Sequence, residues 1–173
     1  MNIQFTRKIA LFEPTSVAKC LKIFDNEDIP SITYATPNVL ELKTWVESKE
    51  FNKIKESEKY WESLNSLRLY QSFRDQLDRN LPESFKNQGI PQMCIMMLPI
   101  IKNLIVKCGS DGVFIASKIL KQDYKEWEDI TTNKSESRVA HLPDDGQGVV
   151  LQHMKSEKLD KIINSTGKLI LLR

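Results

Sequence analysis

Residues 103–117 read NLIVKCGSDGVFIAS, and this stretch decides the fold class. Its first seven residues form a short apolar run, typical of a strand that is covered on both faces in a parallel sheet. The glycine-containing segment 109–112 (GSDG) predicts a tight turn, and VFIAS at 113–117 predicts a second strand at hairpin distance. The stretch therefore predicts a hairpin whose first strand also belongs to a parallel sheet.

Two strand–turn–helix units precede this hairpin. Residues 3–12 predict a strand, and residues 17–25 then repeat apolar side chains at helical spacing. The same order recurs, with a β-branched and aromatic strand at 31–36 and an amphipathic helix over 39–47. Strands that alternate with helices and end in a late hairpin predict a layered α/β fold, with a mostly parallel sheet and right-handed crossovers.

The other segments are less regular. Residues 50–89 are charged and helix-favouring, and we expect one or two amphipathic surface helices there. Residues 90–102 predict a more buried helix, whereas the weak pattern of 123–148 indicates a surface loop or an edge region. A further short strand is expected at 162–163. With 173 residues, the chain is long enough for about one domain, and we predict a single domain over 1–173.

Composition excludes several classes of protein. Lys and Arg total 25 and Asp and Glu total 23, which gives a net charge of 25 − 23 = +2, and 40% of the residues are hydrophobic. These values are ordinary for a soluble globular protein and argue against a polybasic nucleic-acid arm or a disordered chain. The longest nearly apolar run, residues 93–101, is about half of what a bilayer span needs. We therefore expect no nucleic-acid or membrane partner, and a cytoplasmic location.

The cysteines and histidines do not form a pattern typical of a metal site. Cys20, Cys94 and Cys108 are odd in number and lie in apolar segments without C-x-x-C spacing, so we expect buried, inert thiols. His141 and His153 have no Cys or carboxylate at ligand spacing, and we expect them on the surface or in loops.

Three turns follow the carboxyl ends of predicted strands, where open α/β sheets place their ligands. They lie at residues 37–41, 107–112 and 164–167. Asn38, with Glu41 three residues later, is typical of a helix capping box, and capping alone can explain this pair. The same geometry would let Glu41 hold Mg²⁺ through water and let Asn38 meet a phosphate.

The second turn has its own two explanations. Gly109 and Gly112 would let the backbone approach a polyphosphate closely. A G-x-x-G segment by itself, however, mostly marks a hairpin turn, so the spacing leaves both explanations open.

Three motifs, in order, resemble the ribokinase-like (PfkB) sugar-kinase family. TPNVLEL at 36–42 resembles the N-x-x-E motif of that family, and LIVKCGSDGVFI at 104–115 resembles its strand–G-x-x-G–strand. KIINSTG at 161–167 is similar to the lead-in to its GAGD signature. FEPTSVAK followed by ITYATPN, within 12–38, is most similar to the pseudouridine-kinase branch. The resemblance covers most of the chain, as the central to C-terminal part of a family member.

The resemblance implies a doubly wound α/β/α sandwich with a small β lid, and transfer of the ATP γ-phosphoryl group to a sugar hydroxyl. ATP and Mg²⁺ would be the cofactors, with a sugar or nucleoside as the acceptor. Glu41 would hold the Mg²⁺. The implied nucleotide-binding residues are Asn38, Lys107, Gly109, Gly112, Thr166 and Gly167.

The chain also departs from the family pattern. Lys107 stands where many members have Thr. After Gly167 the family continues Ala-Gly-Asp, and that Asp is its catalytic base, whereas this chain reads Lys168-Leu169-Ile170. From the resemblance we also expect the N-terminal part with the lid and the helix after GAGD to be absent. The resemblance therefore implies a partial ribokinase-like domain.

Three interpretations of this partial domain stay open. The first is a partial carbohydrate or pseudouridine kinase that is inactive as this chain alone. The second is a non-enzymatic remnant that acts as a nucleotide-binding or protein-interaction module. An unrelated α/β binding domain is the third. In a partial sheet we also expect an unpaired edge or apolar face, which favours a homodimer or a complementary chain.

Overall fold

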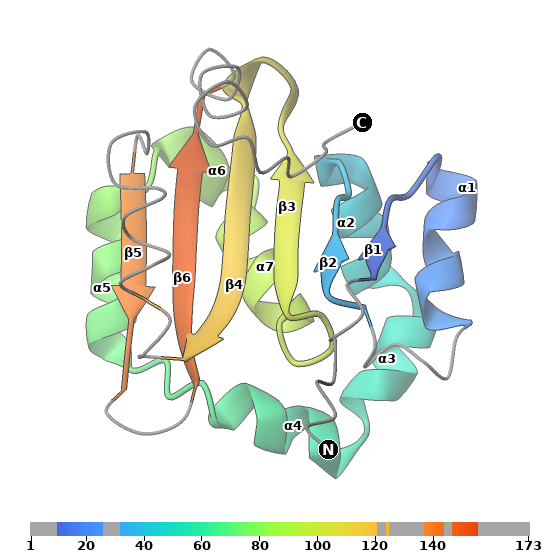
Figure 1. Cartoon of the computed structure of the whole chain (residues 1–173), viewed down its shortest axis with the longest axis horizontal. Coiled ribbons are helices and arrows are strands. Elements are labelled where there is room, and N and C mark those ends of the chain that lie inside the picture. The colour runs from blue at the N-terminus through green and yellow to red at the C-terminus, as the bar shows by residue number, and fades with distance from the viewer. Residues whose placement is uncertain (1–9, 26–31, 121–123, 125–136, 144–146, 156–173) are drawn as a thin grey trace, which may run out of the picture.

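A mixed β-sheet forms the centre of the molecule (Figure 1). The structure is a computed structural model that describes residues 10–25, 32–120, 124, 137–143 and 147–155. Within this part of the chain the sheet has six strands, in the order β1-β2-β3-β4-β6-β5. Their bounds are β1 Leu11–Phe12, β2 Tyr34–Ala35, β3 Asn103–Lys107, β4 Val113–Leu120, β5 Ser137–His141 and β6 Gln147–Met154. The predicted α/β class with a layered sheet is confirmed.

The predicted hairpin and its parallel neighbour are both present. β3 pairs antiparallel with β4, and Leu104 lies opposite Ala116. On its other side β3 pairs parallel with β2, where Leu104 lies opposite Ala35, and β2 pairs parallel with β1. The turn between β3 and β4 contains a short 3-10 helix, η3 (Gly109–Asp111). The pairs β4–β6 and β6–β5 are antiparallel, so the sheet is mixed.

The described helices connect the parallel strands. α2, α5, α6 and α7 lie behind the sheet in Figure 1, and α1 lies beside β1. Their bounds are α1 Val17–Cys20, followed by the 3-10 helix η1 Leu21–Phe24, then α2 Val39–Glu47, α3 Lys49–Lys55, α4 Glu58–Asn65, α5 Gln71–Asn80, α6 Glu83–Asn87 and α7 Ile90–Met97.

The charged segment 50–89 contains more helices than the one or two predicted. It holds most of α3 and all of α4, α5 and α6. The hydroxyls of Ser48 and Ser57 accept hydrogen bonds from backbone N–H groups in the first turns of α3 and α4, so each serine begins a new helix. Pro82 separates α5 from α6. The amphipathic pattern is continuous across these breaks, which is why it predicted fewer helices.

Other element predictions are shortened or corrected. The strand predicted at 3–12 is described only as the two-residue β1, and the buried helix predicted over 90–102 ends at Met97, two residues before Pro99. Part of the weak segment 123–148 is β5, which is the last strand in the described sheet order. β6 lies between β4 and β5 and was not predicted. The strand predicted at 162–163 lies outside the described residues.

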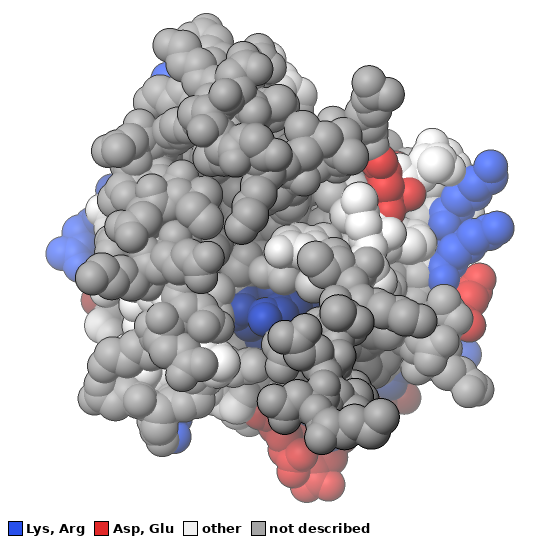
Figure 2. Space-filling model, viewed as in Figure 1, with Lys and Arg blue, Asp and Glu red and all other residues white. Residues whose placement is uncertain are grey.

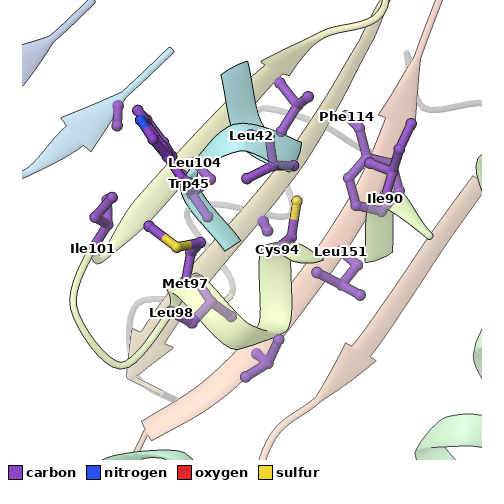
Figure 3. Close-up of a cluster of buried hydrophobic side chains, with 14 of the residues drawn as sticks. Leu42, Trp45, Ile90, Cys94, Met97, Leu98, Ile101, Leu104, Phe114 and Leu151 are labelled. Atoms are coloured by element: carbon purple, nitrogen blue, oxygen red, sulfur yellow. The ribbon is translucent and has the colours of Figure 1, made fainter. Parts of the chain in front are cut away.

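The main core lies between the sheet and the helices (Figure 3). Leu42 and Trp45 of α2 and Met97 of α7 are fully buried there, against Leu104 and Leu151 of the sheet. The indole Nε1 of Trp45 also donates a hydrogen bond of 2.9 Å to the backbone oxygen of Cys20. A smaller apolar cluster contains Ile105, Val113 and Met154, which project from the other face of the sheet.

The histidine prediction was wrong for His153, which lies in the interior of β6 with only 4% of its surface exposed. His141 is half-buried at the end of β5. Cys20 and Cys94 are fully buried, as predicted, whereas Cys108 is half-buried, and all three are free thiols.

The described part of the chain contains no helix with the length and apolar character that crossing a membrane requires. On the face drawn in Figure 2, the described acidic and basic side chains appear in several separate places, and neither sign covers the face.

Candidate functional site

The carboxyl ends of β1, β2 and β3 meet at one edge of the sheet, because the three strands are parallel neighbours. Glu13 directly follows β1, Asn38 lies three residues after the end of β2, and Lys107 is the last residue of β3. The backbone N–H of Lys107 donates a 2.8 Å hydrogen bond to the Pro37 oxygen, and Asn38 and Lys107 form an isolated parallel bridge. The structure thus brings together two predicted site residues that are 69 positions apart (107 − 38 = 69).

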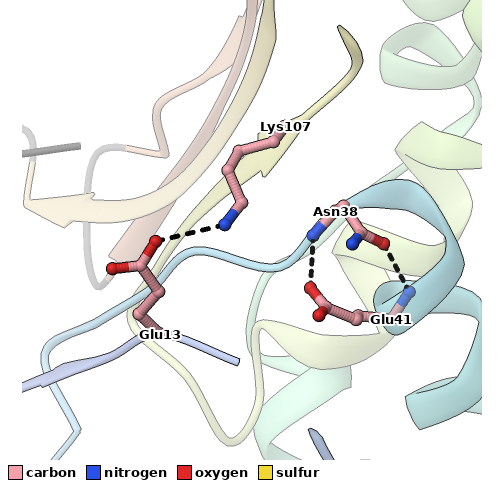
Figure 4. Close-up of polar contacts among 4 residues, drawn as sticks. All are labelled: Glu13, Asn38, Glu41 and Lys107. Carbon is pink, nitrogen blue, oxygen red and sulfur yellow. Dashed lines mark hydrogen bonds and ion pairs between the residues drawn. The ribbon is translucent and has the colours of Figure 1, made fainter. Parts of the chain in front are cut away.

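Asn38 and Glu41 form the predicted capping box at the start of α2 (Figure 4). The Asn38 Oδ1 accepts from the backbone N–H of Glu41 at 2.9 Å, and the Glu41 Oε2 accepts from the backbone N–H of Asn38 at 2.8 Å. Glu41 is only 3% exposed. Within the described part of the chain the Asn38 Nδ2 donates no hydrogen bond. The capping explanation is therefore confirmed, and it leaves the amide N–H groups of Asn38 available to a ligand.

Lys107 forms an ion pair with Glu13 across the edge of the sheet. The Lys107 Nζ lies 3.3 Å from the Glu13 Oε1, and about a third of each side chain is exposed (Figure 4). An ion pair in such a partly hydrated position is weak, and either charge can turn to another partner at small cost. Glu13 was not predicted as a site residue from the sequence. The available signal was its place directly after a strand, the same signal that selected Asn38.

The glycine turn follows Lys107 directly and continues the same edge. Gly109 has φ +59° and Gly112 has φ +87°, both in the region that strongly favours glycine. The backbone N–H of Cys108 donates a 2.8 Å hydrogen bond to the Gly112 oxygen, which closes the turn. Among the described residues, a Cβ built on Gly109 would meet nothing within 4 Å, so open space adjoins the backbone there.

Cys108 lies inside this turn but is not an activated thiol. Removal from water and, to a smaller extent, the nearby carboxylate of Asp111 together raise the pKa of Cys108 to about 12. Its Sγ donates a 3.4 Å hydrogen bond to the Val106 oxygen. The thiol is therefore protonated at neutral pH, and the predicted inert character is supported at this position.

The described residues alone do not make a complete metal site. Among them, no three His, Cys, Asp or Glu side chains gather as they would around a metal ion. Glu13 and Glu41 both lie at the edge, and each already has a partner. Mg²⁺ commonly binds to one or two carboxylates, several waters and phosphate oxygens, so the edge fits Mg²⁺ only as part of a phosphate complex. The predicted residues Thr166 and Gly167 lie outside the described residues.

Comparison with models of known protein families finds no match for this chain. Among curated proteins, the chain is similar to the pseudouridine-metabolizing bifunctional protein of Schizosaccharomyces pombe, with 35% identity over 116 residues. The match covers 65% of this chain and 16% of that protein, so the chain spans only a small part of its relative.

Proposed function

We propose that this chain is related to pseudouridine and sugar kinases, and that the edge formed by Glu13, Asn38 and Lys107 binds the phosphates of Mg²⁺-bound ATP. The observation that carries the proposal is the bridge between Asn38 and Lys107, which places an amide, an ammonium group and the start of α2 beside the glycine turn. Similarity to a pseudouridine-metabolizing protein supports the choice of kinase branch.

Each of these groups can interact favourably with a phosphate. The start of α2 offers the positive end of the helix dipole, and the Asn38 Nδ2 adds hydrogen-bond donors. Lys107 supplies a positive charge once a phosphate replaces Glu13 as its partner. The open space at Gly109 lets phosphate oxygens approach the backbone. Glu41, and Glu13 after it leaves Lys107, would hold Mg²⁺ through water, and the ion would offset phosphate charge.

We further propose that this chain alone binds ATP without efficient phosphoryl transfer. In the resembling family the proton of the sugar hydroxyl goes to the Asp of the GAGD signature, and here Gly167 is followed by Lys168. A positioned base contributes about 10²–10⁴-fold to such reactions. The second candidate is a non-enzymatic remnant that keeps the phosphate site as a nucleotide-binding or protein-interaction module, and the same departure at Lys168 favours it.

The binding test uses two charge-removing variants and a matched control. Titration calorimetry with MgATP should show at least a tenfold weaker affinity for Lys107→Ala. Glu41→Gln should also weaken MgATP binding, although Gln still serves at this position of a capping box and α2 stays intact. Lys102→Ala removes the same charge next to the opposite end of β3 and should bind MgATP as the unmodified chain does. Equal affinities for the Lys107 and Lys102 variants would contradict the proposal.

An assay of phosphoryl transfer distinguishes the two candidate functions. The full chain is incubated with ATP and pseudouridine, and formation of the phosphorylated nucleoside is followed by mass spectrometry. We expect no turnover above a sample without protein. Turnover that disappears in Glu41→Gln would instead establish an active kinase and rule out the non-enzymatic remnant.

A further inference from the structure

A histidine of β6 contacts the glycine turn between β3 and β4. The Nε2 of His153 lies 2.7 Å from the backbone oxygen of Asp111, a residue 42 positions earlier in the chain. A carbonyl oxygen can only accept, so the Nε2 carries the hydrogen and donates it. The histidine lies opposite Phe114 in the pairing of β4 with β6, and its side chain reaches from there to the turn.

The other hydrogen bonds of the turn are local. Three backbone bonds of 2.8 to 3.1 Å join residues 108–112 to one another. In the described part of the chain, His153 is the only residue beyond β3 and β4 that makes a hydrogen bond to residues 108–112. The local bonds therefore set the shape of the turn, and the bond from His153 connects the turn to a third strand of the sheet.

The imidazole of His153 is itself fixed by packing. The residue is only 4% exposed, and its ring packs on Phe85 of α6 with ring centroids 4.4 Å apart. Phe85 in turn stacks on Phe114 of β4 with ring centroids 5.6 Å apart. Because side chains in a close-packed interior are held in defined rotamers, the Nε2 meets the turn from a rigid position.

The histidine is a less stable choice for this position than an apolar residue. Its Nδ1 is buried and has no hydrogen-bond partner. A buried acceptor without a partner is destabilising, and a side chain such as Leu would fill the position without that penalty. Natural sequences keep such unfavourable groups mainly at functional sites. The contact that an apolar side chain could not make here is the hydrogen bond to the turn.

We propose that His153 is a positioning residue for phosphate binding, and that its Nε2 holds the glycine turn in the conformation to which phosphate oxygens bind. This inference rests on the proposed function. The turn directly follows Lys107, and the open space at Gly109 lies within it. His153 acts through the backbone of the turn and does not itself contact the phosphate. Without its hydrogen bond, ATP binding must also order the turn, and the affinity falls.

Hydrogen exchange tests the contact without any ligand. In NMR of the isotope-labelled full chain, the amide of Cys108 reports the opening of the turn, and the amide of Leu104 reports the paired strands. His153→Leu should speed exchange at Cys108 at least fivefold and leave Leu104 unchanged. His153→Gln should match the unmodified chain, because the Gln Nε2 can still donate to the Asp111 oxygen. Equal Cys108 rates in His153→Leu and the unmodified chain would overturn the proposal.

Titration calorimetry with MgATP tests the consequence for binding. The affinity should fall about fivefold in His153→Leu, the loss expected for one neutral hydrogen bond, and should be restored in His153→Gln. Gln152→Leu is the matched control. It replaces the fully buried polar side chain next to His153 in β6, which projects from the other face of the sheet, and it should bind MgATP normally.

The outcomes separate this inference from the proposed function. If the unmodified chain binds no MgATP, the proposed function fails and the role of His153 fails with it. If the unmodified chain binds MgATP and His153→Leu binds it equally well, only the role of His153 is overturned. If His153→Leu does not fold, His153→Phe takes its place in both experiments, because it keeps a ring against Phe85 and lacks the donor.

Discussion

Cys108 lies between Lys107 and the glycine turn, and its partial burial lowers the reactivity of its thiol. Its pKa is raised from 9.0 to about 12. At pH 8 the thiolate population is then roughly 1,000-fold smaller than that of an ordinary thiol, and the thiolate is the nucleophile. A ligand bound at the turn would therefore be held through charge and hydrogen bonds, not through a covalent bond to sulfur.

We predict that Cys108 of the folded chain resists alkylation. Iodoacetamide at pH 8 should modify it at least 100-fold more slowly in buffer than in denaturing urea, as measured by mass spectrometry of the Cys108 peptide. The urea sample is the control, because unfolding returns the thiol to its usual pKa. Equal rates in the two conditions would show that the turn does not bury this thiol.

At the residue scale, the sequence predicted part of the site. Asn38 and Lys107 were both predicted and are adjacent, because parallel strands bring their carboxyl ends to one edge. Glu13 directly follows a strand but was not predicted, since nothing local indicates that it meets Lys107. The pairing of Ser137 with His153 was not predicted, because it depends on the β5–β6 register, which no local pattern reports.

At the element scale, a tyrosine connects two helices of the layer behind the sheet. Tyr60 of α4 is 3% exposed, and its hydroxyl donates a 2.9 Å hydrogen bond to the backbone oxygen of Met96 in α7. Burial raises the pKa of Tyr60 from 10.0 to about 12. The folded chain therefore keeps this proton over a range of pH in which the unfolded chain loses it.

We predict that the folded state loses a stabilising contribution of Tyr60 in strong base. Below pH 10 its contribution is complete, and it is lost as the pH rises toward 12, because only the unfolded state releases the proton in that interval. Between pH 8 and pH 11.5 the unmodified chain should lose roughly 2 kcal/mol more unfolding free energy than Tyr60→Phe. Urea unfolding at the two pH values measures this difference. Tyr70→Phe, at a tyrosine that is 62% exposed, should follow the unmodified chain.

The prediction of elements from the sequence fails where polar residues occupy buried positions. β3 and β4 were predicted correctly because apolar residues fill them and glycines mark the turn. β6 was missed because its apolar residues 149–151 are followed by Gln152 and His153, which are polar yet 0% and 4% exposed. A strand that contains buried polar residues shows no clean alternation of apolar and polar residues in its sequence. Only its pairing with β4 and β5 identifies β6 as a strand of the sheet.

At the scale of the whole molecule, one apolar core connects distant parts of the chain. The cluster on the helix side contains Cys20 of α1. It also contains Leu42 of α2 and Leu151 of β6, which are labelled in Figure 3. Because the same contacts join the N-terminal strand–helix units to the C-terminal strands, these parts should lose their structure together. The predicted single domain therefore leads to a direct test by unfolding.

We predict one cooperative unfolding transition, which a single core substitution moves as a whole. Leu42→Ala deletes a fully buried side chain of α2 and should lower the unfolding free energy by about 2–5 kcal/mol. Tryptophan fluorescence and far-ultraviolet circular dichroism should report the same shifted urea midpoint, since the core is continuous. Leu40→Ala makes the same change on the same helix at a side chain that is 60% exposed, and it should stay within about 0.5 kcal/mol of the unmodified chain. Two separate midpoints, with only one of them moved by Leu42→Ala, would mean that α2 and the C-terminal strands belong to different folding units.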